Sequence, residues 1–257
     1  MTKDGGQRIA TADGAMLADP ESLGNLVGAA LEAAFEPEFW AARGELIEAT
    51  GGRGSAWFIS GSGRWVLRHY RRGGWIARLS RDRYLWAGET RVRAFAEYRV
   101  LAQLVRRGLP VPKPVAARYG RTGPFYRCDL ITQRIAGARP LSSVLSLGPL
   151  NEDTWREVGA AVARLHAAGA DHADLNAHNI LLGIDGAVSV VDFDRGMLRT
   201  PGEKSGAWAA RNLSRLHRSL VKVSRDLPPD RFPAAAWDRL LAGYRLPAGY
   251  RLPAGCG

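Results

Sequence analysis

Cysteine is scarce in this chain of 257 residues: Cys128 and Cys256 are the only two. So few thiols exclude a disulfide framework and a thiolate zinc cluster. The sequence also lacks an apolar run of about 18 residues, the length that predicts a membrane-spanning helix. Residues 1–20 are polar and have no apolar core of a secretory leader, so we expect no signal peptide. These absences predict a soluble protein of a reducing compartment.

Lysine is nearly absent as well, because only four of the 36 basic residues are lysines. With 25 acidic residues, the net charge is +11 and the sequence pI is about 10.3. Hydrophobic residues make up 46% of the chain, which is enough for a core and excludes wholesale disorder.

The positive charge is concentrated in residues 64–93. This segment has nine arginines against Asp82 and Glu89, a net charge of +7. Its interleaved aromatic residues are Trp65, Tyr70, Trp75, Tyr84 and Trp86. Such a segment suits nucleic acid, an anionic membrane surface or a phosphorylated substrate, and composition does not choose among the three.

The first half of the chain has the pattern of a β-rich lobe. Residues 1–22 look like a loose leader, and the alanine-rich residues 23–35 predict a short helix. Apolar residues at helical spacing predict one long helix over 90–107, ended by Gly108. Short apolar runs predict five strands, at 45–50, 55–60, 64–70, 115–119 and 125–135.

The second half has a mainly helical pattern. The predicted helices cover 140–147, 153–168, 207–225 and 233–243, and a hairpin joins strands at 180–182 and 188–191. The sequence GYRLPA occurs twice in succession at 243–254, where we expect a disordered tail. The predicted fold class is α+β with two lobes. The predicted domains are an N-terminal extension (1–36), a β-rich lobe (37–134), a helical catalytic lobe (135–243) and the tail (244–257).

The most informative spacing lies between His172 and Asp194. Phosphoryl transfer needs a carboxylate that accepts the proton of the attacking hydroxyl, and oxygen ligands for the Mg²⁺ on the phosphates of ATP. Asp174 is followed five residues later by Asn179, and Asp192 comes after the predicted hairpin. This matches the kinase pattern H-R-D-x-x-x-x-N and D-F-G, with alanine at the arginine position and aspartate at the glycine position. The match predicts Asp174 as the catalytic base and Asn179 and Asp192 as Mg²⁺ ligands.

Upstream residues fit a nucleotide site. The glycine-rich turn between the first two predicted strands is suited to cover phosphates with its backbone N–H groups. The residues assigned to this turn are Gly52, Arg53, Gly54 and Ser55. The third predicted strand should supply a cation for the α- and β-phosphates, and Arg68 stands where kinases at large have lysine. Glu97 in the long helix is expected to orient Arg68, with Glu89 as the alternative partner.

Four runs of sequence carry a more specific resemblance: 66–74, 108–112, 172–179 and 192–196. They resemble the 3-deoxy-D-manno-octulosonic acid (Kdo) kinases, a lipopolysaccharide-core branch of the protein-kinase-like fold, over residues 39–220. The resemblance implies a five-stranded β lobe with one long helix, followed by a mainly helical lobe. It also implies transfer of phosphate from ATP, with Mg²⁺, to the 4-hydroxyl group of Kdo on a lipid A precursor (Kdo-lipid IVA). Arg68 matches this branch.

Two departures from protein kinases favour a small or lipid-linked acceptor. Ala173 replaces the arginine that binds a phosphorylated activation loop, and no A-P-E sequence follows Asp192. Two rival functions are an atypical protein kinase of the RIO type and a degenerate kinase fold that binds membrane or nucleic acid. The intact pair of Asp174 and Asn179, with Asp192, argues against the degenerate fold.

The resemblance also implies a location and partners. They are the cytoplasmic face of the inner membrane, its anionic surface and the lipid-linked Kdo acceptor, with no nucleic acid. We expect residues 64–93 to contact anionic head groups, and Trp75, Tyr84 and Trp86 to reach the interfacial layer. The sequence predicts no oligomeric state.

Overall fold

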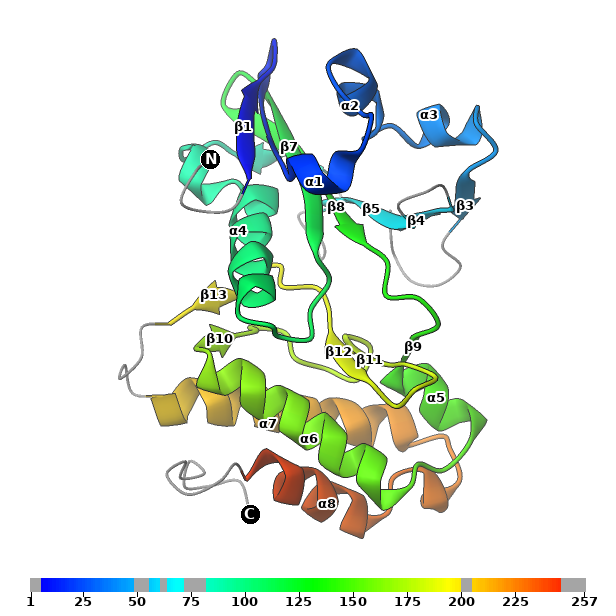
Figure 1. Cartoon of the computed structure of the whole chain (residues 1–257). Helices are drawn as coiled ribbons and strands as arrows, with labels where there is room; N and C mark the ends of the chain where they lie inside the picture. Colours follow the sequence, from blue (N-terminus) through cyan, green and yellow to red (C-terminus); the bar gives the residue numbers. More distant parts are fainter. Residues whose placement is uncertain (1–5, 49–55, 61–63, 72–81, 200–204, 246–257) are drawn as a thin grey trace. The chain divides into compact units, whose positions relative to one another are not determined.

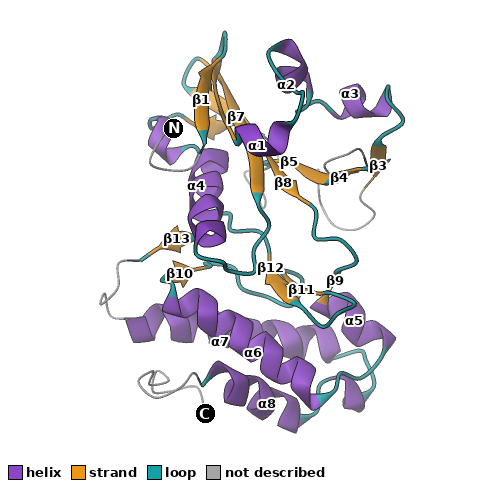
Figure 2. Ribbon diagram, in the orientation of Figure 1, coloured by secondary structure: helices purple, strands orange, loops and turns teal. Residues whose placement is uncertain are grey.

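The computed structural model describes residues 6–48, 56–60, 64–71, 82–199 and 205–245 (Figure 1). The chain divides into two compact units. The first comprises Met1–Gln103 and Pro112–Arg134, and the second comprises Leu104–Val111 and Ile135–Gly257. Strands predominate in the first unit and helices in the second (Figure 2). The fold class is therefore α+β, as the sequence predicts.

The first unit is built on one antiparallel sheet with the strand order β1-β2-β7-β8-β5-β4-β3, and β6 also pairs with β8. The strands are β1 (Gln7–Ala10), β2 (Gly14–Ala18), β3 (Leu46–Glu48), β4 (Ala56–Ile59), β5 (Trp65–His69), β6 (Tyr84–Leu85), β7 (Pro114–Thr122) and β8 (Phe125–Gln133). β7 and β8 form a long hairpin that turns at Gly123, where φ is +57°. Glycine adopts this φ without steric strain.

The interpretation of residues 1–22 as a loose leader is wrong. β1 and β2 form a hairpin, and β2 pairs with β7 from Gly14 opposite Gly120 to Ala18 opposite Ala116. Residues 15–18 are buried, so this segment is a part of the sheet. The sequence pattern did not indicate a strand, because four consecutive apolar side chains show no alternation of period two.

The two faces of the sheet are covered by different helices. On one face, Phe95 of α4 (Arg93–Arg106) packs against Tyr119 of β7, with 5.2 Å between the ring centroids. The short 3-10 turn η2 (Glu89–Arg91) precedes α4. On the other face, the core contains Met16, Leu31, Phe35, Trp40, Leu67 and Ile131. The helices that contribute to this second core are α1 (Pro20–Leu23), α2 (Ala29–Ala33) and α3 (Pro37–Ala41).

The prediction of a single helix over residues 23–35 is also wrong. The chain forms α1 and α2 instead, separated by Gly24 and Gly28. These glycines have φ values of +58° and +53°, which are incompatible with a continuous right-handed helix. The alanine-rich composition favours helix, but the two glycines end it.

The second unit is mainly helical. Its elements are β9 (Arg139–Pro140), α5 (Leu141–Leu147), α6 (Glu152–Ala167), β10 (Ala170–Asp171), β11 (Ile180–Leu182), β12 (Val188–Val190), β13 (Met197–Leu198), α7 (Ser205–Ser224), η3 (Pro229–Arg231) and α8 (Ala234–Tyr244). None of the helices in the described part of the chain has the length and apolar character needed to cross a bilayer.

Glycine allows α6 and α8 to pack closely. A Cβ atom on Gly159 of α6 would lie 1.9 Å from the carbonyl oxygen of Leu240. A Cβ atom on Gly243 of α8 would lie 1.9 Å from the carbonyl oxygen of Arg156. Because no such contact is tolerated, any side chain at either position would force the two helices apart.

Candidate active site

The predicted catalytic residues lie in the loops beside the short strands of the second unit. Asp174 follows β10, Asn179 immediately precedes β11, and Asp192 comes after β12. β11 and β12 form an antiparallel hairpin, and the backbone N–H of Val191 donates to the carbonyl oxygen of Asn179 at 2.9 Å. The hairpin therefore returns Asp192 to the loop that contains the other two residues.

Side-chain amides hold the backbone of this loop. Nδ2 of Asn176 and Nδ2 of Asn179 both donate to the carbonyl oxygen of Asp174, at 2.9 and 3.1 Å. Oδ1 of Asn176 accepts hydrogen bonds from the backbone N–H groups of His178 and Asn179. The carboxylate of Asp174 is itself 59% exposed and lies 3.4 Å from Nη1 of Arg215 on α7. The backbone is fixed while the predicted base stays accessible.

Two residues of the site have a left-handed backbone. The φ angle is +52° at Ala173 and +65° at Asp192. Such a conformation costs a residue with a side chain about 1–3 kcal/mol and is found where the surroundings enforce it. Here Nε2 of His172 donates to the carbonyl oxygen of Val191 at 2.9 Å, which joins the residues that precede Ala173 and Asp192. Burial lowers the pKa of His172, so the ring makes this bond as a neutral donor.

A buried carboxylate anchors the start of the loop. Asp171 accepts hydrogen bonds from Nε and Nη2 of Arg199, at 3.0 and 2.7 Å, and from Nδ2 of Asn212 at 2.9 Å. Burial alone would raise the pKa of Asp171, but these hydrogen bonds lower it below the ordinary value. Arg199 follows β13 and Asn212 lies on α7, so three separate segments meet at one carboxylate.

Sequence reasoning missed this anchor and also missed Arg215. The partners of Asp171 lie 28 and 41 residues away along the chain, and no local spacing connects them. Arg215 does have a signal, since it is one of several basic residues at helical spacing in α7.

The oxygen atoms of the loop fit a magnesium ion. Mg²⁺ is commonly bound through one or two carboxylates together with substrate phosphates and water. Nδ2 of Asn179 is used in the bond to Asp174, which leaves its Oδ1 as the ligand atom, and Asp192 supplies a carboxylate. Within the described ranges, no group of three or more His, Cys, Asp or Glu side chains forms a metal cluster. Two such oxygen donors suit an ion whose remaining ligands would be nucleotide phosphates and water.

In the first unit, Arg68 of β5 forms an ion pair with Glu97 of α4. The hydroxyl of Tyr70 donates to the same carboxylate and accepts a hydrogen bond from Nη2 of Arg68 at 2.9 Å. The Glu97 side chain is 3% exposed and the Arg68 side chain is 25% exposed. Burial raises the pKa of Tyr70 well above its ordinary value, so the hydroxyl keeps its proton. The side chains of Arg68, Tyr70 and Glu97 therefore form one hydrogen-bonded cluster. The sequence did not predict that Tyr70 belongs to it.

The alternative partner of Arg68 has other contacts. Glu89 accepts hydrogen bonds from Nε of Arg8 and from the hydroxyl of Tyr119, both at 2.9 Å. The ion pair is therefore the predicted one, Arg68–Glu97. The predicted phosphate-covering residues Gly52, Arg53, Gly54 and Ser55 lie outside the described residues. The nucleotide-binding roles of the pair and of this turn stay predictions.

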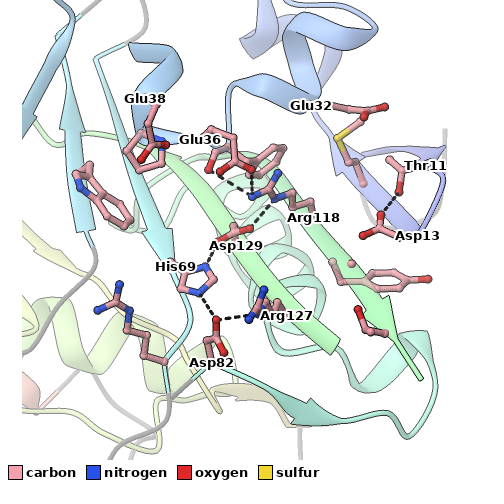
Figure 3. Close-up of a pocket in the computed structure, with 18 residues that line it drawn as sticks. Thr11, Asp13, Glu32, Glu36, Glu38, His69, Asp82, Arg118, Arg127 and Asp129 are labelled. Carbon is pink, nitrogen blue, oxygen red and sulfur yellow. Dashed lines mark hydrogen bonds and ion pairs between the residues drawn. The ribbon is translucent and has the colours of Figure 1, made fainter. Parts of the chain in front are cut away.

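A polar pocket of about 520 Å³ lies on the other face of the same sheet (Figure 3). Successive residues of a strand point to opposite faces, so His69 enters this pocket while Arg68 points to α4. The pocket contains a chain of ion pairs, Glu36–Arg118–Asp129–His69–Asp82–Arg127. Arg118 and Arg127 each pair with a carboxylate here, and none of the described residues assigned to catalysis or to the nucleotide lines the pocket.

The described aromatic residues of the basic segment 64–93 are mainly packing residues. Tyr84 is buried and packs on Tyr126 with 5.5 Å between ring centroids. The prediction that Tyr84 reaches a membrane interface is wrong, because β6 pairs with β8 and turns this ring inward. Trp86 is half-buried against Tyr119, at 5.1 Å, and Trp75 lies outside the described residues.

Comparisons with known proteins give a consistent result. Residues 37–244 match the model of the lipopolysaccharide kinase (Kdo/WaaP) family. A 3-deoxy-D-manno-octulosonic acid kinase of Xanthomonas euvesicatoria pv. vesicatoria (strain 85-10) is 47% identical over 211 residues, which are 82% of this chain and 81% of the relative. A protein of the same name from Xylella fastidiosa (strain 9a5c) is 48% identical over 190 residues, 74% of each chain. The matched region contains the Arg68–Glu97 pair and the whole loop of Asp174.

Proposed function

The chain belongs to the lipopolysaccharide kinase (Kdo/WaaP) family, and we propose that it transfers the γ-phosphoryl group of ATP to the 4-hydroxyl group of Kdo on Kdo-lipid IVA. Its family and its relatives make it a kinase of lipopolysaccharide core biosynthesis. The observation that carries the proposal is the linkage of Asp174, Asn179 and the residue before Asp192 by hydrogen bonds inside the matched region.

Asp174 is the proposed catalytic base. Its carboxylate is exposed on a loop whose backbone is held by two amide side chains, so it can meet an acceptor without rearrangement of the loop. In the proposed reaction it accepts the proton of the sugar hydroxyl as the oxygen attacks the γ-phosphorus atom, while the bond from that phosphorus to the β–γ bridging oxygen breaks and ADP leaves. A positioned general base of this kind contributes roughly 10²–10⁴-fold to the rate.

The remaining assigned residues would hold the nucleotide. Asn179 and Asp192 are the proposed ligands of Mg²⁺, which when bound neutralises negative charge on the phosphates. The exposed part of the Arg68 guanidinium is suited to bidentate binding of phosphate, while Glu97 and Tyr70 fix its orientation. We assign the covering of the phosphates to Gly52, Arg53, Gly54 and Ser55.

A lipid-linked acceptor requires that the enzyme work at a bilayer surface. We therefore propose a peripheral location at the cytoplasmic face of the inner membrane. The net charge of +11 supports this location, because anionic head groups attract arginine and lysine near the surface.

The test is ATP consumption by the purified chain with three acceptors: Kdo-lipid IVA, the same lipid without Kdo, and a mixture of protein substrates. We expect turnover that depends on Mg²⁺ and occurs with the Kdo-bearing lipid alone. Turnover with proteins but not with the lipid would instead support a protein kinase. Nucleotide binding without turnover on any acceptor would support a binding module.

A further inference from the structure

Helix α7 carries a second basic surface that the sequence reasoning did not use. Its 20 residues contain no aspartate and no glutamate. Arg211, Arg215, Arg218 and Lys222 are all exposed, and they follow one another at spacings of four, three and four. At about 100° per residue these positions fall within an arc of about 60°, and at about 1.5 Å per residue they extend over about 16 Å. We call these four residues the basic face of α7.

Packing does not account for the basic face. The buried residues of α7 are on its other side and include Leu213, Leu216 and Leu220. Like charges three and four residues apart destabilise a helix by a few tenths of a kcal/mol per pair, roughly 0.2–0.5 kcal/mol. Among the described residues, the ion pairs of the structure include only one of the four, Arg215. The positive charge is therefore retained against a small loss of stability.

The basic face lies beside the proposed base. Nη1 of Arg215 is 3.4 Å from Oδ1 of Asp174. One turn further along the helix, the hydroxyl of Ser219 accepts a hydrogen bond from the backbone N–H of Ala177, in the same loop, at 3.1 Å. An anion on the basic face would consequently lie close to a hydroxyl group that is held at Asp174.

We propose that the basic face of α7 binds the negatively charged groups of the acceptor glycolipid, its sugar carboxylate and its lipid phosphates, while the reacting hydroxyl lies at Asp174. This inference rests on the proposed function and names the surface that holds its acceptor. Arg215, nearest the base, contacts the anionic group nearest the reacting hydroxyl, and Arg211, Arg218 and Lys222 contact more distant ones. The length of the face, about 16 Å, suits a ligand with several separated anionic groups.

The position of the face favours the acceptor over two other anions. The nucleotide phosphates are assigned to Mg²⁺, to Asn179 and Asp192 and to Arg68, whereas Arg215 pairs with the base itself. Proteins bind nucleic acid through many contacts to its phosphates. A carboxylate such as that of Asp174 beside the basic residues would repel these phosphates. The acceptor is the one anion that must be present at Asp174.

The test uses a triple variant, Arg211→Gln, Arg218→Gln and Lys222→Gln, in the full chain. A matched control removes three exposed arginines elsewhere in the second unit: Arg106→Gln, Arg164→Gln and Arg245→Gln. Both variants lose the same net charge. Binding is measured with Kdo-lipid IVA in neutral detergent micelles, with micelles that hold the same lipid without phosphate, and with a single-stranded oligonucleotide. Steady-state kinetics are measured for ATP and for the acceptor.

We expect a rise of roughly 30- to 100-fold in both the dissociation constant and the apparent KM for the acceptor in the triple variant, at about threefold to fivefold per charge. The KM for ATP and the behaviour of the control variant should match the wild type. Removal of the lipid phosphates should weaken binding to the wild type and leave the triple variant little changed.

Several results would overturn the inference. They are equal loss of binding in the control variant, a raised KM for ATP in the triple variant, or tighter binding of the oligonucleotide than of the acceptor. Binding and kinetics separate the two proposals. If the wild type binds the acceptor through the basic face but does not phosphorylate it, the proposed function fails and this inference stands. If the wild type phosphorylates the acceptor and the triple variant binds it normally, only this inference fails.

Discussion

The candidate residues of the two units differ in how they are held. In the first unit, Arg68, Tyr70 and Glu97 bind one another, and the Glu97 side chain is only 3% exposed. In the second unit, the backbone of the loop is fixed by amide side chains, while the side chain of Asp174 is 59% exposed. The first unit thus holds a cation in a set orientation, whereas the second leaves the carboxylate of Asp174 largely exposed.

Replacing Asp174 by Asn should have the largest effect. The amide cannot accept the hydroxyl proton, so we expect kcat to fall by roughly 10²–10⁴-fold. Because the loop backbone is bonded through the carbonyl of residue 174 and not through its side chain, nucleotide affinity should stay near that of the wild type. A variant that keeps more than a tenth of the wild-type kcat would show that Asp174 is not the base.

Arg68→Ala should have the next largest effect, with a loss of roughly 10²-fold in kcat/KM for ATP. Arg68→Lys should recover only a part of it, because an ammonium group restores a charge but not a planar fork between Glu97 and Tyr70. The affinity for ATP is measured by nucleotide titration, and kcat/KM for ATP is measured by steady-state kinetics, for both variants. A lysine variant with a higher kcat/KM than the wild type would contradict a role for the orientation of Arg68 by Glu97 and Tyr70.

Asp171→Asn should act on stability and on the loop together. The change leaves Arg199 and Asn212 without their carboxylate, and we expect a loss of about 1–3 kcal/mol in the free energy of unfolding. The pKa of Asp171 is lowered in the folded state, so the carboxylate stabilises the fold above its unfolded pKa of about 3.9. That contribution is lost as the pH falls through the lower, folded pKa.

Denaturant unfolding at several pH values measures the free energy of unfolding of the wild type and of Asp171→Asn. The difference between the wild type and Asp171→Asn should be full near neutrality and should shrink at acidic pH, below about pH 4. Arg156→Gln, which removes the exposed ion pairs of Arg156 with Glu152 and Asp153 on α6, is the control and should change stability little. A difference that stays constant from neutral to acidic pH would mean that the charge of Asp171 does not hold the loop.

Neutralising the basic segment should have the smallest effect on the reaction. Replacing Arg71, Arg72, Arg78 and Arg81 together should release the chain from anionic vesicles and raise the apparent KM for the acceptor by roughly 3- to 10-fold. Salt should weaken the binding of the wild type in the same way. Co-sedimentation unaffected by both the substitutions and salt would place the membrane contact on another surface, for which the basic face of α7 is the first candidate.

Sequence reasoning predicted correctly those contacts between candidate residues that follow from spacing along the chain, while the roles of these residues stay predictions. The kinase pattern placed Asp174, Asn179 and Asp192 in loops that hydrogen bonds do link, and the third strand and long helix supplied the Arg68–Glu97 pair. These predictions depend on local order, because a hairpin and an alternating strand fix where a nearby residue points.

The predictions from the sequence were wrong or incomplete where contacts between distant segments determine the structure. β2 is a strand because β7 pairs with it, about 100 residues later, and its own pattern of apolar residues is uninformative. Tyr84 is buried because Tyr126 lies opposite it on β8. Asp171 meets Arg199 and Asn212 only after the second unit has folded. The partners in each of these pairs are too far apart along the chain for a local sequence pattern to connect them.

We propose that the exposed carboxylate of Asp174 in the second unit activates the 4-hydroxyl group of Kdo for phosphorylation. The most direct test is mass spectrometry, with localisation of the phosphate by fragmentation, on Kdo-lipid IVA incubated with ATP, Mg²⁺ and either the wild type or Asp174→Asn. We predict one added phosphoryl group on the 4-hydroxyl of Kdo with the wild type and almost none with the variant. Phosphate on the lipid A portion, or equal product from both proteins, would contradict the claim.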